Sequence, residues 1–285
     1  MGRAFERTAL IPPRSVISSR SAEAARDILV KPAAWPEGIG IVKTVYVVRG
    51  TASQVKSSIS VFSPEGELQA VVAGDTLTAL RTAAASAYAS RRMRGKLSGK
   101  LAVLGTGRQA EAQTRAFVEA HDITEVAVWG RRQEAAADLV KALSDLPVRV
   151  RPTATSADAV EAARIVTAAT ASTRPMFERC DVEPGSHIDL VGGFRPDMRE
   201  ATDDLFTDAV VVADTATALL EAGDLIGPIA SGHLREDSIR FLADVDGPLR
   251  LSGTQISLFK SVGYAAEDLV AIELLLQKLE MSGAR

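Results

Sequence analysis

Cysteine, histidine and long hydrophobic runs are scarce in this chain of 285 residues. The single cysteine, Cys180, excludes an intrachain disulfide, and a reducing cytoplasm is the simplest setting for such a protein. The three histidines, His121, His187 and His233, are far apart in the sequence and give no pattern of metal ligands. We therefore expect no bound metal ion. No apolar run approaches the ~18 residues of a membrane helix, so we also expect no membrane partner.

Strong charge of either sign is also missing. The formal net charge is −3 and the isoelectric point is about 5.8, which gives no basic surface for a nucleic acid. Hydrophobic residues make up 46% of the chain, enough for a large core in a soluble protein. The length fits two domains better than one.

The N-terminal third is rich in strand-forming residues. Residues 38–73 contain β-branched runs interrupted by the turn sequence Ser63-Pro64-Glu65-Gly66. We expect strands at 40–48, 58–62 and 68–73, with an antiparallel hairpin around the turn.

From residue 100 onward, short apolar runs alternate with helical patterns. Strands are expected at 101–104, 126–129, 148–150, 165–169, 187–191 and 209–213, and helices at 108–120, 134–143, 156–162 and 216–222. Such alternation predicts a parallel sheet with helices on both faces. Helical spacing of apolar residues predicts two more helices, over 77–94 and 260–281.

A glycine motif lies between the first strand of this region and its helix. The motif consists of Gly105, Thr106, Gly107, Arg108, Gln109 and Ala110. Gly105 permits a tight turn, Gly107 lets the backbone approach a pyrophosphate, and Ala110 keeps the helix close to the strand. The helix N-terminus adds amide donors and partial positive charge. The spacing alone is common, but between a strand and a helix it predicts a dinucleotide site.

The end of the second strand indicates which dinucleotide is bound. NAD-binding domains usually carry an acidic residue there, which bonds the ribose 2′-hydroxyl. Here Trp129 and Gly130 are followed by Arg131 and Arg132. Two guanidinium groups suit a 2′-phosphate, so we expect NADP(H), with NAD(H) as the alternative.

Several short segments in a fixed order carry a further signal. They are Pro12–Arg14, Gly40–Lys43, Leu77–Ala85 (LTALRTAAA), Gly105–Gln109, Val191–Glu200 (VGGFRPDMRE), Glu221–Leu225, Phe259–Gly263 (FKSVG) and Glu267–Asp268. Together they span nearly the whole chain, and the combination of the LTALRTAAA and FKSVG segments is specific. In these segments the sequence resembles the ornithine cyclodeaminase/mu-crystallin family.

The resemblance implies an α/β fold in which a doubly wound Rossmann domain is inserted in a smaller α+β domain. The smaller, substrate-binding and dimerisation domain is expected at 1–96 plus 256–285, and the NAD(P)-binding domain at 97–255. We also expect a homodimer, because an open antiparallel sheet leaves an edge that a symmetric partner can cover.

The resemblance also assigns roles to individual residues. It implies that Arg14, Lys43 and Arg81 bind the α-carboxylate of the substrate and take part in catalysis, and that Val262 faces the substrate. Three cations around one small acid would neutralise it and fix its orientation. The residues implied around the cofactor, besides the glycine motif and the two arginines after the second strand, are Ser58, Arg81, Thr170, Val191, Gly192, Gly193 and Ser261.

One position separates the activities within the family. Cyclodeaminases carry an acidic residue directly after the paired glycines, where this chain has Phe194. Phenylalanine can neither accept a proton nor pair with an ammonium group, and Asp197 would replace the acid only if the loop bent back. We therefore expect an NADPH-dependent reductase that converts Δ1-pyrroline-2-carboxylate or Δ1-piperideine-2-carboxylate to L-proline or L-pipecolate. Lys43 or a bound water would supply the proton, and the sequence leaves that choice open.

Three other interpretations stay open at this point. One is an ornithine cyclodeaminase that retains NAD and makes proline and ammonia. The others are an amino-acid dehydrogenase acting on alanine and a non-catalytic protein that binds NADPH. Family members usually have about 25–30 more residues before the Pro-Pro-Arg segment. The short N-terminus leads us to expect an incompletely covered substrate domain, with weaker substrate affinity or a weaker dimer.

Overall fold

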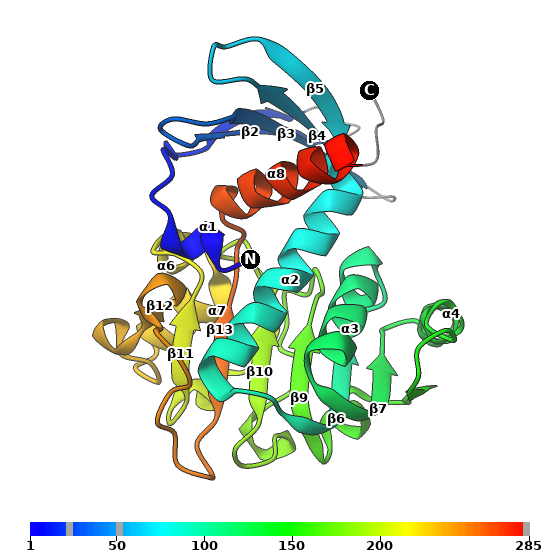
Figure 1. Ribbon diagram of the computed structural model, residues 1–285. Coiled ribbons are helices and arrows are strands. Elements are labelled where there is room, and N and C mark those ends of the chain that lie inside the picture. Colours follow the sequence, from blue (N-terminus) through cyan, green and yellow to red (C-terminus); the bar gives the residue numbers. More distant parts are fainter. Residues whose placement is uncertain (21–24, 50–53, 282–285) are drawn as a thin grey trace. The chain divides into compact units, whose positions relative to one another are not determined.

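The computed structural model describes residues 1–20, 25–49 and 54–281, and its contacts divide the chain into two compact units (Figure 1). The first unit consists of Met1–Arg81 and Tyr264–Arg285, and the second of Thr82–Gly263. The continuous second unit therefore interrupts the first in the sequence. Within the described residues, no helix combines the length and the hydrophobicity that a membrane span needs.

The unit boundaries differ from the expected 96/97 and 255/256. One reason is α2 (Gly74–Arg94), a single helix that crosses from the first unit to the second at Arg81. Its second half bonds to the second unit, where Gln113 Nε2 donates to Ser86 Oγ at 3.0 Å. The other reason is β13 (Ser257–Lys260), which is a fully buried strand of the larger sheet.

The first unit is built on a five-stranded antiparallel sheet. Its strands, in spatial order, are β1 (Ser15–Arg20), β2 (Ala25–Ala34), β3 (Gly40–Arg49), β4 (Gln54–Phe62) and β5 (Leu68–Ala73). The expected hairpin is confirmed, since β4 and β5 pair across the turn at 63–66. β1 and β2 were not predicted, because β1 is mostly polar and Pro32 interrupts β2. Pro32 is tolerated because β1 pairs with β2 only as far as Val30, so its missing N–H lies beyond that ladder.

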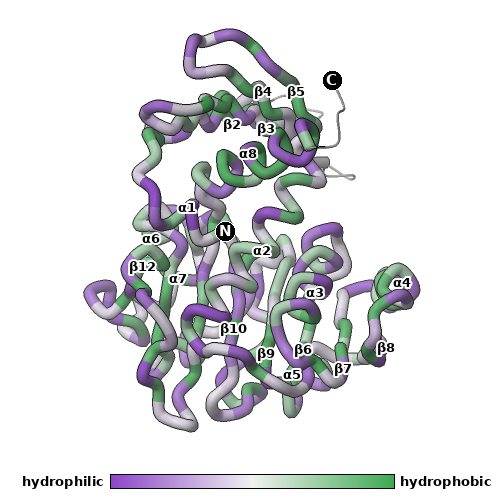
Figure 2. The backbone as a smooth tube through the Cα atoms, viewed as in Figure 1, coloured by the Kyte–Doolittle hydropathy of each residue, from purple (hydrophilic) through white to green (hydrophobic). Residues whose placement is uncertain are grey.

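One face of this sheet is covered by α8 (Ala265–Met281). The buried core between them includes Ile41, Ile59 and Val61 from the sheet and Leu269 and Ile272 from the helix. Figure 2 shows α8 as mostly hydrophobic. The short α1 (Arg3–Glu6) also contacts α8, and its Ala4 is completely buried. The apolar stripe expected along 260–281 therefore serves packing.

The second unit contains an eight-stranded sheet in which every pairing is parallel, as expected from the alternating pattern. The strands are β6 (Ser98–Leu104), β7 (Asp122–Trp129), β8 (Arg149–Pro152), β9 (Ala163–Ala168), β10 (His187–Leu190), β11 (Val210–Ala213), β12 (Arg240–Phe241) and β13. The helices are α3 (Arg108–Ala120), α4 (Gln133–Ala142), α5 (Ser156–Val160), α6 (Thr217–Glu221) and α7 (Gly223–Ala230), together with the second half of α2.

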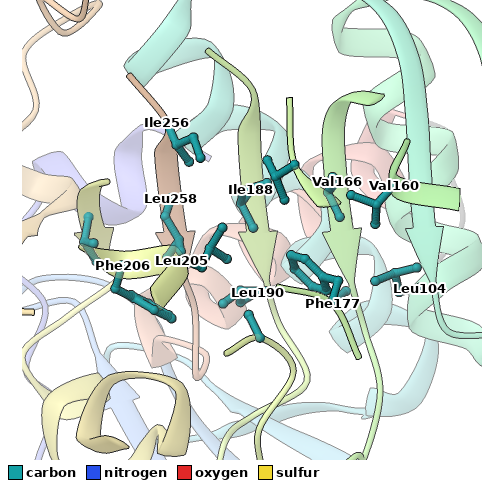
Figure 3. Close-up of a cluster of buried hydrophobic side chains, with 14 of the residues drawn as sticks. Leu104, Val160, Val166, Phe177, Ile188, Leu190, Leu205, Phe206, Ile256 and Leu258 are labelled. Atoms are coloured by element: carbon teal, nitrogen blue, oxygen red, sulfur yellow. The ribbon is translucent and has the colours of Figure 1, made fainter. Parts of the chain in front are cut away.

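Both faces of this sheet are buried. Leu101 and Val103 pack with Phe117 and Leu139 of α3 and α4. Leu104 instead belongs to a cluster on the opposite face, which is formed with α5, α6, α7 and the loops (Figure 3). Helices on both faces of a parallel sheet make this unit a doubly wound Rossmann fold, as predicted.

The strand order places a switch point beside β6. The sheet runs β12-β11-β13-β10-β9-β6-β7-β8, so the chain builds outward from β6 to β8 and then returns to β9 on the other side. In open parallel sheets ligands bind outside the carboxyl ends of the strands at such a point. The glycine motif begins there, directly after β6.

We predict that Leu269→Ala lowers the free energy of unfolding by about 2–5 kcal/mol, because the side chain is completely buried between α8 and the sheet. Leu279→Ala, on the same helix but 41% exposed, serves as the control and should change it by less than about 0.5 kcal/mol. Denaturant unfolding followed by circular dichroism measures both. Equal losses in the two variants would contradict this packing.

Candidate active site

The glycine turn after β6 has the geometry that dinucleotide binding requires. Gly105 has φ +127°, which L side chains rarely adopt, and its amide donates to Trp129 O at 2.9 Å. A Cβ atom on Gly105 would lie 2.6 Å from Ala169 O. The tight turn is therefore possible only with glycine.

Gly107 is required for a different reason. It is the N-cap of α3 with φ −88°, it is exposed, and a Cβ atom there would meet no protein atom within 4 Å. Neither strain nor packing accounts for glycine, whereas close approach of a phosphate to the backbone does. Ala110, one turn into α3, is completely buried as expected. These residues fit a dinucleotide pyrophosphate at the N-terminus of α3.

Arg131 and Arg132 follow β7 at the same edge of the sheet. Both are exposed, and neither side chain forms a hydrogen bond or an ion pair with another described residue. Arg132 is the N-cap residue of α4. Both guanidinium groups thus remain available for an anionic ligand.

The loops after β9 and β10 are tied together by Glu200, a completely buried carboxylate. Glu200 Oε1 accepts from Thr170 N at 2.8 Å and from Thr170 Oγ1 at 2.9 Å, and Oε2 accepts from Gly192 N at 2.7 Å. Burial raises the pKa of Glu200 to about 7, although the charge of Lys260 opposes the shift. Two of the loops expected to flank the cofactor therefore depend on one side chain.

Asp224 connects this arrangement to the end of β13. Asp224 Oδ1 accepts from Glu200 N at 2.7 Å, and Lys260 Nζ donates to Oδ2 at 3.2 Å; both side chains are completely buried. A Cβ atom on Gly193 would collide with Asp224 Oδ2. The paired glycines are therefore needed because the loop packs directly on buried charges.

The loop that contains Ser261 and Val262 is held by Asp214, a buried residue at the end of β11. Asp214 Oδ2 accepts from Ser261 Oγ at 2.9 Å and from the amides of Val262 and Gly263 at 2.8 Å each. Burial raises the pKa of Asp214, and these donors oppose the shift. All the cofactor residues expected in this unit thus lie at the carboxyl ends of its parallel strands.

In the first unit, Lys43 and Arg81 meet two acidic residues of α8. Lys43 Nζ donates to Asp268 Oδ1 at 2.9 Å and to Oδ2 at 3.2 Å. Arg81 Nε donates to Asp268 Oδ1 at 3.0 Å, and Arg81 Nη1 to Glu267 Oε2 at 2.5 Å. All four residues are buried. We call Lys43, Arg81, Glu267 and Asp268 the ion-pair cluster.

The charges in the ion-pair cluster shift one another's protonation. Burial and then the charge of Arg81 lower the pKa of Lys43 to about 8, although Asp268 opposes the shift. Burial disfavours the charges of Asp268 and Arg81, but their mutual attraction outweighs it. This attraction lowers the pKa of Asp268. Together with the charge of Glu267, it raises the pKa of Arg81. The Lys43 ammonium therefore loses its proton more readily than that of an ordinary lysine.

The structure brings together only part of the expected substrate site. Lys43 and Arg81 are neighbours, but Asp268 and Glu267 balance their charges. Arg14 is half-buried and directly precedes Ser15, which pairs with Val30 of β2. The next residue of β2, Lys31, pairs with Lys43. Arg14 and Lys43 therefore belong to the same end of the sheet.

Ser58 is exposed and pairs with Thr44, whereas Lys43 pairs with Ile59. Because side chains alternate along a strand, Ser58 lies on the sheet face opposite Lys43. The structure does not bring these two expected site residues together.

The loop after the paired glycines offers no carboxylate in place of Phe194. Phe194 is 43% exposed, and Asp197 is exposed and accepts from Arg195 Nη2 at 2.9 Å. The expectation that Asp197 does not replace the cyclodeaminase acid is consistent with this pairing.

Sequence reasoning missed the buried partners of the site: Asp268, Glu267, Glu200, Asp224, Lys260 and Asp214. The sequence did offer one signal, which is a charged residue in an otherwise apolar segment. Examples are Lys260 at the end of the strand Ser257–Lys260, and Glu267 and Asp268 in the first turn of α8. That signal marks a charge that needs a partner but does not identify the partner.

Known proteins are similar to this chain over most of its length. Delta(1)-pyrroline-2-carboxylate reductase of Paracoccus denitrificans is 34% identical over 91% of this chain and 82% of that protein. Ketimine reductase mu-crystallin of Mus musculus is 36% identical over 77% of this chain and 68% of that protein.

Among solved structures, Delta(1)-pyrroline-2-carboxylate reductase of Thermococcus litoralis, in complex with NADH and L-proline, has a TM-score of 0.91 at 28% identity. The match covers 99% of this chain and 92% of that one. The model of the ornithine cyclodeaminase/mu-crystallin family matches residues 3–283. The chain therefore belongs to the ornithine cyclodeaminase/mu-crystallin family.

Proposed function

We propose that this protein is an NADPH-dependent reductase of cyclic ketimine carboxylates. Its substrates would be Δ1-pyrroline-2-carboxylate and Δ1-piperideine-2-carboxylate, and its products L-proline and L-pipecolate. Within the family, the observation that carries this choice is Phe194, which stands where a cyclodeaminase needs an acid. The similarity to two proteins named as reductases of this type supports it.

The second unit would hold the cofactor at the carboxyl ends of its strands. The turn at 105–110 would bind the pyrophosphate, and Thr170, Gly192 and Ser261 belong to loops already fixed by buried carboxylates. When bound, the reduced nicotinamide supplies a hydride. The protein residues provide binding and orientation, which lower the barrier by removing the need for reorganisation.

The first unit would act on the substrate through Lys43 and Arg81. Arg81 Nη2 makes no hydrogen bond to a described residue, so it remains available for a carboxylate. An imine accepts hydride more readily when its nitrogen is protonated. Lys43 Nζ, which titrates near pH 8, would supply that proton. Arg14 would add a second contact to the carboxylate.

We predict that the purified protein oxidises NADPH when Δ1-pyrroline-2-carboxylate or Δ1-piperideine-2-carboxylate is added, with the matching amino acid as product. Lys43→Met should lower kcat by at least about 100-fold, because general acid catalysis contributes that much, while NADPH still binds. Absorbance at the NADPH band and cofactor fluorescence measure the two effects. Ammonia release from ornithine without imine reduction would instead indicate a cyclodeaminase.

We further propose NADP(H) as the preferred cofactor, with NAD(H) as the alternative, because Arg131 and Arg132 are exposed at the end of β7. The double variant Arg131→Ala/Arg132→Ala should raise KM for NADPH by about 10-fold or more and leave KM for NADH nearly unchanged, since charged hydrogen bonds to a 2′-phosphate are lost. Arg149→Ala, which removes another exposed arginine of the same unit, is the control. An equal rise for both cofactors would argue against this role.

A homodimer is also part of the proposal, together with a cytoplasmic location that suits the free, exposed Cys180. Ile17, Tyr46 and Val71 lie on the face of the five-stranded sheet opposite α8 and are 60%, 39% and 64% exposed. Apolar side chains gathered on one exposed sheet face are typical of a protein interface. A second copy is the partner that the family resemblance implies.

We predict a dimer by light scattering, and a shift to monomer in Ile17→Glu, because a charge on this face would be buried without a partner. The control is Leu220→Glu on α6, where Leu220 is 77% exposed and belongs to the other unit. A dimer that survives Ile17→Glu would mean that association uses another surface.

A further inference from the structure

Two adjacent acidic residues of α8 have different contacts in the ion-pair cluster. Asp268 bonds both Lys43 and Arg81, whereas Glu267 forms an ion pair with Arg81 and none with Lys43. Both are buried, with side-chain exposures of 2% and 0%. Every hydrogen bond that Lys43 Nζ makes within the described residues goes to Asp268. The chain therefore offers a matched pair of carboxylates that differ in their contact with Lys43.

We propose that Asp268 is a positioning residue that keeps the Lys43 ammonium protonated and oriented for proton delivery to the substrate, an inference that rests on the proposed reductase function. It acts through Lys43 and would not itself touch the substrate.

The groups around Lys43 come from three elements. Arg81 on α2 and Lys31 on β2 disfavour its positive charge, as does burial, and Asp268 on α8 favours it. Asp268 is the carboxylate whose charge and hydrogen bond raise the pKa of Lys43. Without its charge, burial and two positive neighbours would remain, and the pKa of Lys43 would fall well below 8.

Glu267 leaves Asp268 available for this task. Arg81 would otherwise compete with Lys43 for the only nearby carboxylate. Because Glu267 binds Nη1 of Arg81, the guanidinium shares its charge between two acids, and Asp268 keeps both oxygens within 3.2 Å of Lys43 Nζ. Two positive and two negative groups then balance within the ion-pair cluster.

The proton step is balanced in this arrangement. One Nζ–H bond of Lys43 breaks as an N–H bond forms at the imine nitrogen, and hydride from the proposed nicotinamide cofactor adds to the ring carbon. Lys43 is left neutral beside Asp268 and regains its proton from solvent. Because Lys43 must be protonated to act, turnover falls as the pH rises through its pKa.

The test compares pH profiles of kcat/KM for imine reduction in the wild type, Asp268→Asn and Glu267→Gln, between about pH 6 and about pH 10. The wild type should lose activity above about pH 8, where Lys43 deprotonates. Asp268→Asn should move this decline to lower pH by about one unit or more, so that its activity at pH 8 falls by about 5-fold or more and partly recovers at lower pH. Glu267→Gln should displace the decline much less than Asp268→Asn does, because Lys43 Nζ bonds Asp268 and not Glu267.

Two outcomes would overturn the proposal. One is a uniform loss in Asp268→Asn with an unmoved decline, which is the result of a merely structural role. The other is an equal displacement in Glu267→Gln. If Asp268→Asn fails to fold, Asp268→Glu takes its place. This variant retains the negative charge and should retain the wild-type pH profile. A decline displaced as far as that expected for Asp268→Asn would contradict the proposal.

A second measurement separates this proposal from the reductase function. An NMR titration of isotope-labelled lysine, with the Lys43 signal assigned through Lys43→Arg, reports its protonation without turnover. A wild type that reduces no imine would end the proposed function. An unchanged Lys43 titration in Asp268→Asn would end the role of Asp268 in an active or an inactive protein.

Discussion

The contact of Asp268 with Lys43 and Arg81 is the constraint on which the first unit depends. It joins three elements: β3, the part of α2 that belongs to the first unit, and α8. The last of these lies near the C-terminal end of the sequence, far from the other two. Apolar packing between α8 and the sheet tolerates small shifts of the helix, but a buried ion pair does not. Removing one partner of such a pair typically costs about 3–5 kcal/mol, because the other charge is left uncompensated. The C-terminal helix is therefore held in one register.

The second unit uses the same device for its loops. Glu200 and Asp214 are buried carboxylates that accept backbone amides from segments following different strands. A loop has no ladder of its own, so its amides need a partner when they are buried. One carboxylate that accepts from two loops satisfies them and fixes their spacing at once. Both units thus position residues of the candidate site through acidic side chains that are not exposed to solvent.

These buried contacts between distant segments explain which features of the fold and the site could be predicted from the sequence. Periodicity predicted the parallel sheet and the hairpin after β4, because repeated apolar positions record burial in one segment at a time. The glycine motif predicted the turn at Gly105, since a strand, a glycine and a helix in succession leave few geometries. β1, β2 and β13 were missed, because their neighbours in the sheet determine their conformation more than their own residues do. The partners of Lys43 were missed for the same reason: Asp268 lies more than two hundred residues away, and a pairing at that distance leaves no local pattern.

The balance of charge in the ion-pair cluster also changes how a substrate acid would be recognised. Sequence alone suggested cations that neutralise a carboxylate, but Lys43 and Arg81 are already neutralised by Asp268 and Glu267. An uncompensated pair of buried cations would bind any small anion, phosphate included. A neutral cluster gains little from charge alone and must rely on directed hydrogen bonds, such as those that Arg81 Nη2 still has to give. Directed hydrogen bonds discriminate by shape. The acids of α8 would therefore lower the affinity for anions in general and raise the selectivity for a planar carboxylate held at one angle.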